Sequence, residues 1–257
     1  MSSSFIKRNR ESSRFSGGYV SLNRALSKLG VASRKTACQA IESGEVQVNG
    51  KIILDTEYLV IPEKSTIVFR GATVTKKSVR VILFHKPRCV MTTRTDPENR
   101  PTVYSFFENE LPGFHAVGRL DYHTSGLLLF TNDTQLSNRL LDPSRQIPRT
   151  YVATVRGRVD SADAPLFTRG VVDNGEHLFA SHVTASKTSN RESRLIIELR
   201  GGKNREIRRL CKLLHHEVLR LKRISFGNFK LGDLAPGQYR EATREELAAC
   251  RQGQYGH

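Results

Sequence analysis

Short apolar runs of strand length recur through the last two thirds of the chain, and they constrain its fold more than any other feature. They lie at residues 80–85, 127–130, 149–157, 193–200 and 216–225. Several alternate apolar with polar residues, which is typical of strands with one buried face. The connections look too short for a regular strand-helix-strand repeat. The sequence therefore predicts an α+β domain with a mostly antiparallel or mixed sheet flanked by helices.

A different pattern occupies the region before these runs. Apolar residues three and four apart predict a first helix with one buried face: Leu22, Ala25, Leu26 and Leu29. Ser33 can cap a second helix. Asn49-Gly50, between apolar residues, is the strongest short signal for a hairpin. We expect a small helix-helix-hairpin domain.

The chain divides at two points. Residues 1–19 are Ser- and Arg-rich and hold few apolar side chains, so we expect a flexible basic tail. They lack the apolar core of a secretory signal, although a transit peptide remains an alternative. A Lys-rich joint at residues 74–80 separates the small domain, residues 20–78, from a larger domain at 79–257.

The charge of the chain points to a polyanionic partner. Its 257 residues include 41 Lys and Arg against 25 Asp and Glu, a formal net charge of +16. Basic side chains that neutralise phosphates release counterions, which favours nucleic-acid binding. A basic surface that is simply well solvated is the alternative.

Signatures of metal, cofactor and membrane chemistry are missing. The four cysteines lie far apart with no C-x-x-C pair, which indicates reduced thiols of a cytosolic protein. We find no phosphate-binding loop, zinc-protease helix, nucleophile elbow or dinucleotide fingerprint. No apolar stretch is long enough to cross a membrane. We expect a cytoplasmic protein without cofactor or metal, whose chemistry uses ordinary side chains.

Basic and hydroxyl residues surround the start of the second predicted helix: Arg24, Ser33, Arg34 and Lys35. The unpaired N–H groups of a helix N-terminus favour phosphate, so these residues are candidates for nucleic-acid contact. A solvated face is the alternative.

Two further stretches indicate a pocket. Arg119 and Asp121 stand two apart in an extended segment, so both side chains can line one site. The alternative is a surface ion pair, which contributes little. Tyr151 follows Arg149 by two residues and either stacks on an unstacked base or belongs to the core.

A two-faced helix is predicted over residues 204–215. Its basic side, together with the residue just before it, comprises Lys203, Arg205, Arg208, Arg209 and Lys212. Eight Lys and Arg but only two Glu lie between residues 203 and 223. That density favours phosphate contact over a solvated face.

Taken together and in order, these segments resemble a known family. Residues 21–53 look like an S4 RNA-binding domain. The successive motifs of the RsuA/RluB family of ribosomal RNA pseudouridine synthases are similar to LFHKPRC, GRLDYHTSGLLLFTND, RTY and GGKNREIRRLC. The resemblance covers about residues 20–245 and is closest to the RluB-like branch, which acts on large-subunit RNA. Two positions depart, His85 where Asn is common and Thr134 where Gly is usual, and neither touches the aspartate motif.

The resemblance implies a site as well as an activity. Asp121 matches the family's catalytic aspartate, and Tyr151 matches the tyrosine that packs on the flipped uracil. The target uridine must leave its stack to reach them. A motif arginine, Arg208 or alternatively Arg205, should pair with Asp121 and keep it ionised, while Arg119 faces the RNA. The carboxylate either adds to the uracil or removes a ribose proton.

The expected partner is ribosomal RNA of the large subunit, 23S RNA, bound by a monomer. An alternative is a ribosome-assembly protein that binds RNA without catalysis. A DNA-binding regulator is a third possibility, but the sequence holds no convincing helix-turn-helix.

Overall fold

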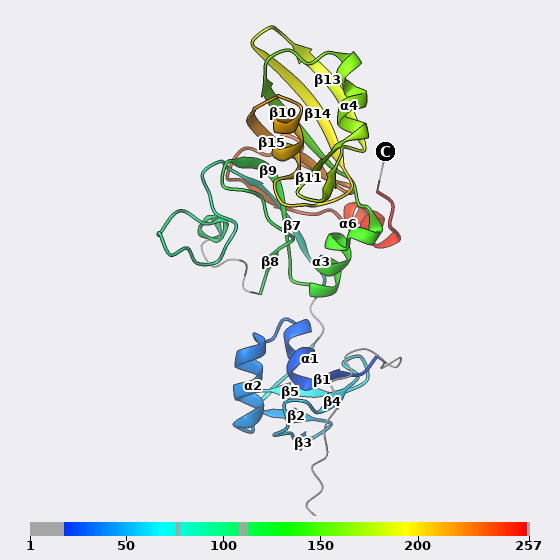
Figure 1. Ribbon diagram of the computed structural model, residues 1–257. Coiled ribbons are helices and arrows are strands. Elements are labelled where there is room, and N and C mark those ends of the chain that lie inside the picture. The colour runs from blue at the N-terminus through cyan, green and yellow to red at the C-terminus, as the bar shows by residue number, and fades with distance from the viewer. Residues whose placement is uncertain (1–17, 76–77, 108–110, 112, 256–257) are drawn as a thin grey trace, which may run out of the picture. The chain divides into compact units, whose positions relative to one another are not determined.

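The computed structural model describes residues 18–75, 78–107, 111 and 113–255. The chain forms two compact units, residues 1–78 and 79–257 (Figure 1). Of the tail expected at residues 1–19, only 18 and 19 fall within the described residues. Each unit is described by itself below.

The N-terminal unit is built from two helices and short strands. Its elements are β1 (Val20–Ser21), α1 (Leu22–Lys28), α2 (Arg34–Glu42), β2 (Val46–Val48), β3 (Lys51–Ile52), β4 (Leu59–Val60), β5 (Ile67–Phe69) and β6 (Ala72–Thr73). The strands pair in the order β3-β2-β5-β6, and β1 pairs separately with β4. The expected helix-helix-hairpin order is confirmed.

Local sequence signals explain this unit. Leu22, Ala25 and Leu26 of α1 are buried against α2 and the strands. Ser33 caps α2, since its hydroxyl accepts a hydrogen bond from the Thr36 amide at 3.1 Å. Asn49 and Gly50 both have positive φ, 51° and 79°, which fits the tight turn between β2 and β3.

The larger unit holds the remaining elements. Its strands are β7 (Val81–Lys86), β8 (His115–Ala116), β9 (Thr124–Thr131), β10 (Arg149–Arg156), β11 (Val171–Asp173), β12 (Glu176–Leu178), β13 (His182–Thr188), β14 (Glu192–Leu199), β15 (Val218–Phe226), β16 (Phe229–Lys230) and β17 (Tyr239–Glu241). Its α-helices are α3 (Thr134–Leu141), α4 (Ala164–Arg169), α5 (Glu206–Leu213) and α6 (Arg244–Gln252), and 3-10 turns lie at Val103–Phe106, Pro143–Arg145 and Ser161–Asp163.

Among the described residues, nine strands form one mixed sheet. The central order is β13-β14-β10-β15-β9-β7-β17, with β16 beside β15 and β8 beside β9. Every pair is antiparallel except β9 and β15, which run parallel. This mixed sheet confirms the predicted α+β class. The parallel junction brings the loop before β9 beside β15.

Both faces of the central strands are covered. On one face Phe84 and Phe130 pack with apolar residues of α4 and α5, and on the other Leu83 and Leu129 pack with those of α3 and α6. Figure 1 shows α4 running along β13 and β14. Burial on both faces explains why residues 81–84 of β7 and 127–130 of β9 are continuously apolar instead of alternating.

The two helices that flank the sheet on its second face are capped by side chains at their N-termini. The Asp133 carboxylate accepts hydrogen bonds from two amides of α3, at 2.8 and 3.2 Å. Thr243 and Glu246 form a capping box at the start of α6. The helix expected over 204–215 spans only Glu206–Leu213, and it begins after Arg205 because that residue adopts a left-handed conformation with φ 48°. The sequence did not predict α4 or the β11–β12 hairpin.

Candidate active site

Asp121 lies in the loop between β8 and β9, and buried contacts fix its backbone. Leu120 beside it is buried. The Asp121 carbonyl accepts hydrogen bonds from the Thr124 amide at 3.0 Å and from the Lys86 ammonium at 3.2 Å. Asp121 is partly exposed, so its carboxylate stays accessible while the loop that carries it is held to the sheet.

Lys86, at the end of β7, is a buried cation beneath this loop. Its side chain is fully buried, and its ammonium donates to the carbonyls of Pro87, Asp121 and Thr124. Burial lowers the pKa of Lys86 to about 8, although the charge of Asp121 opposes that change. The sequence analysis missed this residue. The signal that could have indicated it is a lysine at the end of a buried apolar run.

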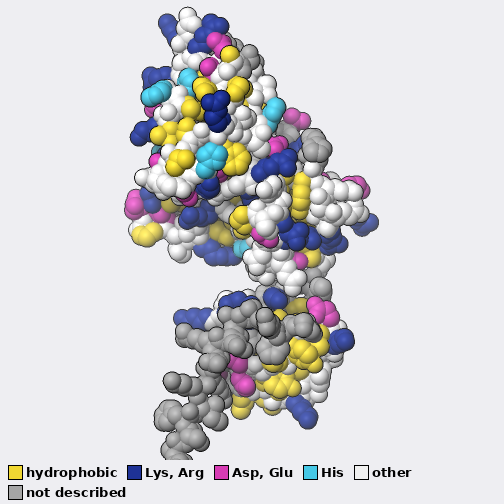
Figure 2. Space-filling view, turned by 45° about the vertical axis from the view of Figure 1, so that its right-hand side comes forward, with side chains coloured by type: hydrophobic (Ala, Val, Ile, Leu, Met, Phe, Trp, Pro, Cys, Tyr) yellow, Lys and Arg dark blue, Asp and Glu magenta, His cyan; other side chains and the backbone are white. Residues whose placement is uncertain are grey.

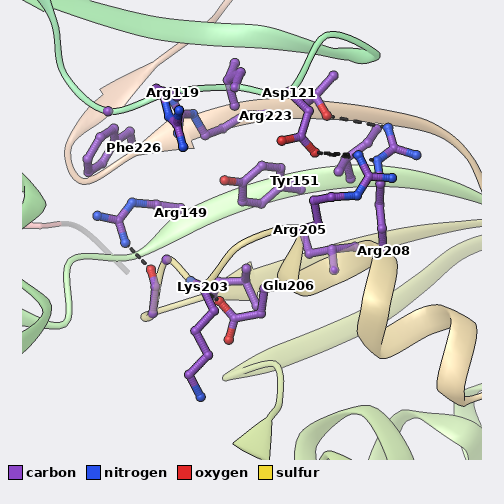
Figure 3. Close-up of a pocket in the computed structure, with 18 of the residues that line it drawn as sticks. Arg119, Asp121, Arg149, Tyr151, Lys203, Arg205, Glu206, Arg208, Arg223 and Phe226 are labelled. Atoms are coloured by element: carbon purple, nitrogen blue, oxygen red, sulfur yellow. Dashed lines mark hydrogen bonds and ion pairs between the residues drawn. The ribbon is translucent and has the colours of Figure 1, made fainter. Parts of the chain in front are cut away.

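Two arginines from the other side of the site pair with Asp121. Arg205 Nη1 lies 3.4 Å from Asp121 Oδ2, and Arg208 Nε lies 3.9 Å from the same oxygen (Figure 3). Among the described residues no ion pair joins Arg119 to Asp121. The expected pairing with Arg208 or Arg205 is confirmed, and both arginines take part in it.

The two arginines differ in how firmly they are held. The Arg208 side chain is 14% exposed, and it also donates to the carbonyls of Val218 and His123. Burial lowers the pKa of Arg208, and the charge of Arg205 adds to this lowering. Arg205 is 51% exposed and makes the closer contact with Asp121. Arg208 is therefore fixed, whereas Arg205 stands at the rim.

Tyr151 lies in β10 with its ring in the wall of a cavity of about 470 Å³. Tyr151 as a whole is 9% exposed, and it also belongs to the hydrophobic core on that face of the sheet. The same cavity is lined by Asp121, Arg205 and Arg208. A second hollow of about 420 Å³ lies beside it, lined by Arg119, Asp121, Lys203 and Arg205 among others. Asp121 and Arg205 therefore border both hollows.

The first residue of α5 carries a buried carboxyl group that is bonded to the turn before the helix. Glu206 is 4% exposed, and its carboxylate accepts a hydrogen bond from the Lys203 amide at 3.1 Å. Burial raises the pKa of Glu206. A Cβ at Gly201 would come within 3.2 Å of this carboxylate, so the glycine permits the close turn. The turn presents Arg205 toward Asp121.

Two of the predicted RNA contacts, Arg209 and Lys203, bond to the β11–β12 hairpin. Arg209 bonds to Asp173 at 2.5 Å and to Glu176 at 2.6 Å, and these carboxylates raise its pKa. Its guanidinium therefore anchors the β11–β12 hairpin to α5, a role that the sequence did not predict. The Lys203 ammonium donates to the His177 carbonyl of the same hairpin. Lys203 nevertheless lines both hollows beside Asp121.

The remaining candidates are exposed. Lys212 and Arg119 lie on the surface of the larger unit, and Arg24, Arg34 and Lys35 lie on the surface of the N-terminal unit. Ser33 is also exposed, but its hydroxyl is engaged by Thr36. The two units carry separate sets of candidate contacts.

His85, one of the two departures from the family pattern, is buried and contacts the Leu234 carbonyl. It is 3% exposed, and its Nδ1 lies 2.6 Å from the Leu234 carbonyl. Burial lowers its pKa. The residue ties β7 to the segment before β17.

Within the described part of the chain, no group of three or more His, Cys, Asp or Glu side chains is arranged to hold a metal ion. No helix in that part is long and apolar enough to cross a membrane.

Known proteins match both units. The model of the RNA pseudouridylate synthase family matches residues 80–213, and the S4 domain model matches residues 20–63. The first confirms the resemblance noted for the larger unit, and the second confirms the one noted for the N-terminal unit.

Whole-length relatives share this organisation. An uncharacterized RNA pseudouridine synthase from Aquifex aeolicus is 34% identical over 230 residues, with 89% of this chain and 92% of the relative covered. Ribosomal large subunit pseudouridine synthase B from Bacillus subtilis is 33% identical, with 90% and 95% covered. A crystal structure of a pseudouridylate synthase has a TM-score of 0.62 at 25% identity, and the match covers 90% of this chain and 99% of that chain. The chain therefore belongs to the RNA pseudouridylate synthase family and is an isomerase that acts on RNA.

Proposed function

We propose that this protein converts a specific uridine of large-subunit ribosomal RNA to pseudouridine, with Asp121 as the catalytic carboxylate. The observation that carries the proposal is that Asp121 pairs with both Arg205 and Arg208 in the wall of a cavity that Tyr151 also lines. Named relatives from Bacillus subtilis and Escherichia coli, the latter 36% identical, support the choice of large-subunit RNA.

The chemistry is an isomerisation, so nothing is gained or lost overall. The bond from ribose C1′ to uracil N1 breaks, and a bond from C1′ to C5 forms. A proton leaves C5, and N1 acquires one. An ionised Asp121 serves this reaction either as the nucleophile that adds to the uracil or as the base that takes a ribose proton. In both cases Arg205 and Arg208 lie where they can pair with the charge of this carboxylate.

The target base must leave its helix to enter such a site. Asp121 lies in the wall of a recessed cavity, where a base stacked in a duplex cannot reach it. Extruding a nucleotide costs about a few kcal/mol, which stacking on an aromatic ring offsets in part. We propose that Tyr151 supplies this ring and that its hydroxyl serves the final proton transfer.

Basic side chains on both units support a polyanionic substrate. Figure 2 shows Lys and Arg side chains spread over the visible face of the larger unit. We propose RNA contacts for Arg119, Lys203, Arg205 and Lys212 near the site, and for Arg24, Ser33, Arg34 and Lys35 in the S4 domain. The four cysteines are free thiols, in keeping with the proposed cytoplasmic location. We propose that the protein acts as a monomer.

Asp121→Asn tests the proposal. The variant should form no measurable pseudouridine in ribosomal RNA, because it lacks the negative charge that the reaction needs, while its affinity for the RNA stays within about twofold. Asp233→Asn provides a matched control, since Asp233 is an exposed residue away from the cavity lining. The assay compares chemical mapping of pseudouridines and RNA binding for the wild type and both variants.

Turnover by Asp121→Asn at a rate near that of an active wild type would refute the catalytic role. A wild type that binds ribosomal RNA but forms no pseudouridine would instead support a non-catalytic assembly factor. A deletion strain whose large-subunit RNA keeps every pseudouridine would argue against the substrate.

A further inference from the structure

The cavity beside Asp121 continues past Tyr151 to a second end with different chemistry. Figure 3 shows this end away from Arg205 and Arg208, where Arg119, Arg149, Arg223 and Phe226 gather. Leu141 and Pro143 complete the nearby wall. One end thus holds a carboxylate with its two arginines, and the other holds cations beside an aromatic ring.

Two guanidiniums at the second end are buried without an acidic partner. Arg149 is 8% exposed and Arg223 is 3% exposed. Among the described residues no ion pair joins either of them to a carboxylate. Burial lowers the pKa of Arg149, and the charge of Arg223 lowers it further. Glu206 attracts Arg149, but its carboxylate bonds to the Lys203 amide.

The protein fixes these arginines but leaves a buried donor atom of Arg223 without a partner. Arg149 donates to the carbonyls of Gly201 and Leu140, and Arg223 Nε donates to the Leu127 carbonyl at 2.7 Å. Arg223 Nη2 is buried and has no hydrogen-bond partner among the residues that the structure describes. A buried charged donor without a partner is costly, since nothing replaces the water it has lost. Here the unpaired donor belongs to Arg223, one of the residues that line the cavity.

The ring of Phe226 sets the geometry of the pair. The Arg149 guanidinium lies 4.6 Å from the ring centroid, and that of Arg223 lies 5.1 Å from it. Contact with an aromatic ring holds each guanidinium in place without neutralising its charge. The result is a preorganised site with excess positive charge.

We propose that Arg149 and Arg223 form a phosphodiester subsite, which holds a backbone phosphate of the RNA next to the flipped uridine. The inference rests on the proposed function, since it takes the uridine to lie between Tyr151 and Asp121. A guanidinium fork matches the oxygens of a phosphate, and the anion supplies the acceptor that Arg223 Nη2 lacks.

Small probes test this subsite in the full-length protein. Uridine, 5′-UMP, 3′-UMP and the dinucleotide UpU are titrated, and dissociation constants are measured by NMR. We expect at least one monophosphate and UpU to bind about tenfold more tightly than uridine. In Arg223→Gln this preference should fall to within twofold, with the affinity for uridine unchanged. Arg156→Gln is the matched control, because Arg156 is exposed on β10 and should keep the full preference.

A second measurement uses the wild type alone, so it does not depend on how a variant folds. Inorganic phosphate should displace the monophosphate from the protein but leave the affinity for uridine unchanged. Probes that bind no more tightly than uridine, or not at all, would overturn the inference, as would a preference that survives in Arg223→Gln. Binding of inorganic phosphate without any preference for UpU would indicate a free-anion site and also refute it. Pseudouridine formation by the same wild type shows whether the proposed function holds independently.

Discussion

Replacing Lys86 by methionine should change how the stability of the larger unit depends on pH. The Lys86 ammonium is buried among three backbone carbonyls, and burial lowers its pKa from an ordinary 10.5 to about 8. In the unfolded chain water solvates the same group, so its pKa returns to the ordinary value. Between these two values the unfolded state binds a proton that the folded state has released.

The sign and size of the effect follow from linkage. Stability rises with pH wherever the unfolded state holds more protons, so Lys86 should make folding more favourable as the pH rises from about 8 to 10.5. At about 1.4 kcal/mol per pKa unit, a pKa lowered to about 8 corresponds to a gain of about 3 kcal/mol. Below pH 8 the lysine is protonated in both states and contributes no slope.

Urea unfolding of the wild type and Lys86→Met between pH 7 and 10.5 measures this gain. Other groups titrate in the same range, but they do so in both proteins and cancel in the difference. The free energy of unfolding of the wild type, relative to the variant, should be level up to about pH 8 and then rise. Lys230→Met, at an exposed position, should follow the wild type throughout. If the difference in the free energy of unfolding between the wild type and Lys86→Met stays flat or falls above pH 8, the lowered pKa assigned to the buried Lys86 ammonium is wrong.

Three further substitutions test how the site is built. Gly126→Ala should lower the free energy of unfolding by about 3 kcal/mol or more, because its Cβ would lie 2.1 Å from the Arg223 carbonyl oxygen; Gly157→Ala, with similar positive φ but open space, should cost about 1 kcal/mol in the same denaturant assay. Arg208→Met should slow single-turnover pseudouridine formation about tenfold or more, which corresponds to an increase of about 1.4 kcal/mol in the activation free energy. An unchanged rate would show that Arg205 alone suffices. Arg209→Met should speed hydrogen exchange in the β11–β12 hairpin while RNA affinity changes less than twofold, and the opposite result would restore it as an RNA contact.

Features set by local sequence were predictable. The caps at Ser33, Asp133 and Thr243 depend on side chains within three residues, and all three are present. The buried strand at Leu127–Phe130 follows from its continuous apolar run. Pairing of Asp121 with a distant arginine was predictable from the resemblance to a family, since spacing alone does not bring together residues more than eighty positions apart.

Features set by tertiary contact were not predictable. Helical periodicity placed Arg205 and Arg209 on one basic face, but a left-handed residue at Arg205 starts the helix later. Asp173 and Glu176 of the β11–β12 hairpin form ion pairs with Arg209, and no local sequence pattern predicted that hairpin. The buried state of Lys86 depends on carbonyls contributed by the Asp121 loop, which is 35 residues away in sequence.

The distribution of charge in the cavity has a consequence for how a substrate enters. At one end, where we propose that the reaction takes place, Asp121 already pairs with Arg205 and Arg208, so these arginines are less available to a phosphate. At the other end, no carboxylate within the described part of the chain forms an ion pair with Arg149 or Arg223, although Glu206 attracts Arg149. A nucleotide that carries both an uncharged base and a charged phosphate is therefore favoured in one orientation, with the phosphate toward Phe226 and the glycosidic bond toward Asp121. Reversing the charge at the far end, as in Arg223→Glu, should weaken RNA binding more than Arg223→Gln does, because it adds repulsion to the loss of attraction. Equal losses in the two variants would show that charge does not set the orientation.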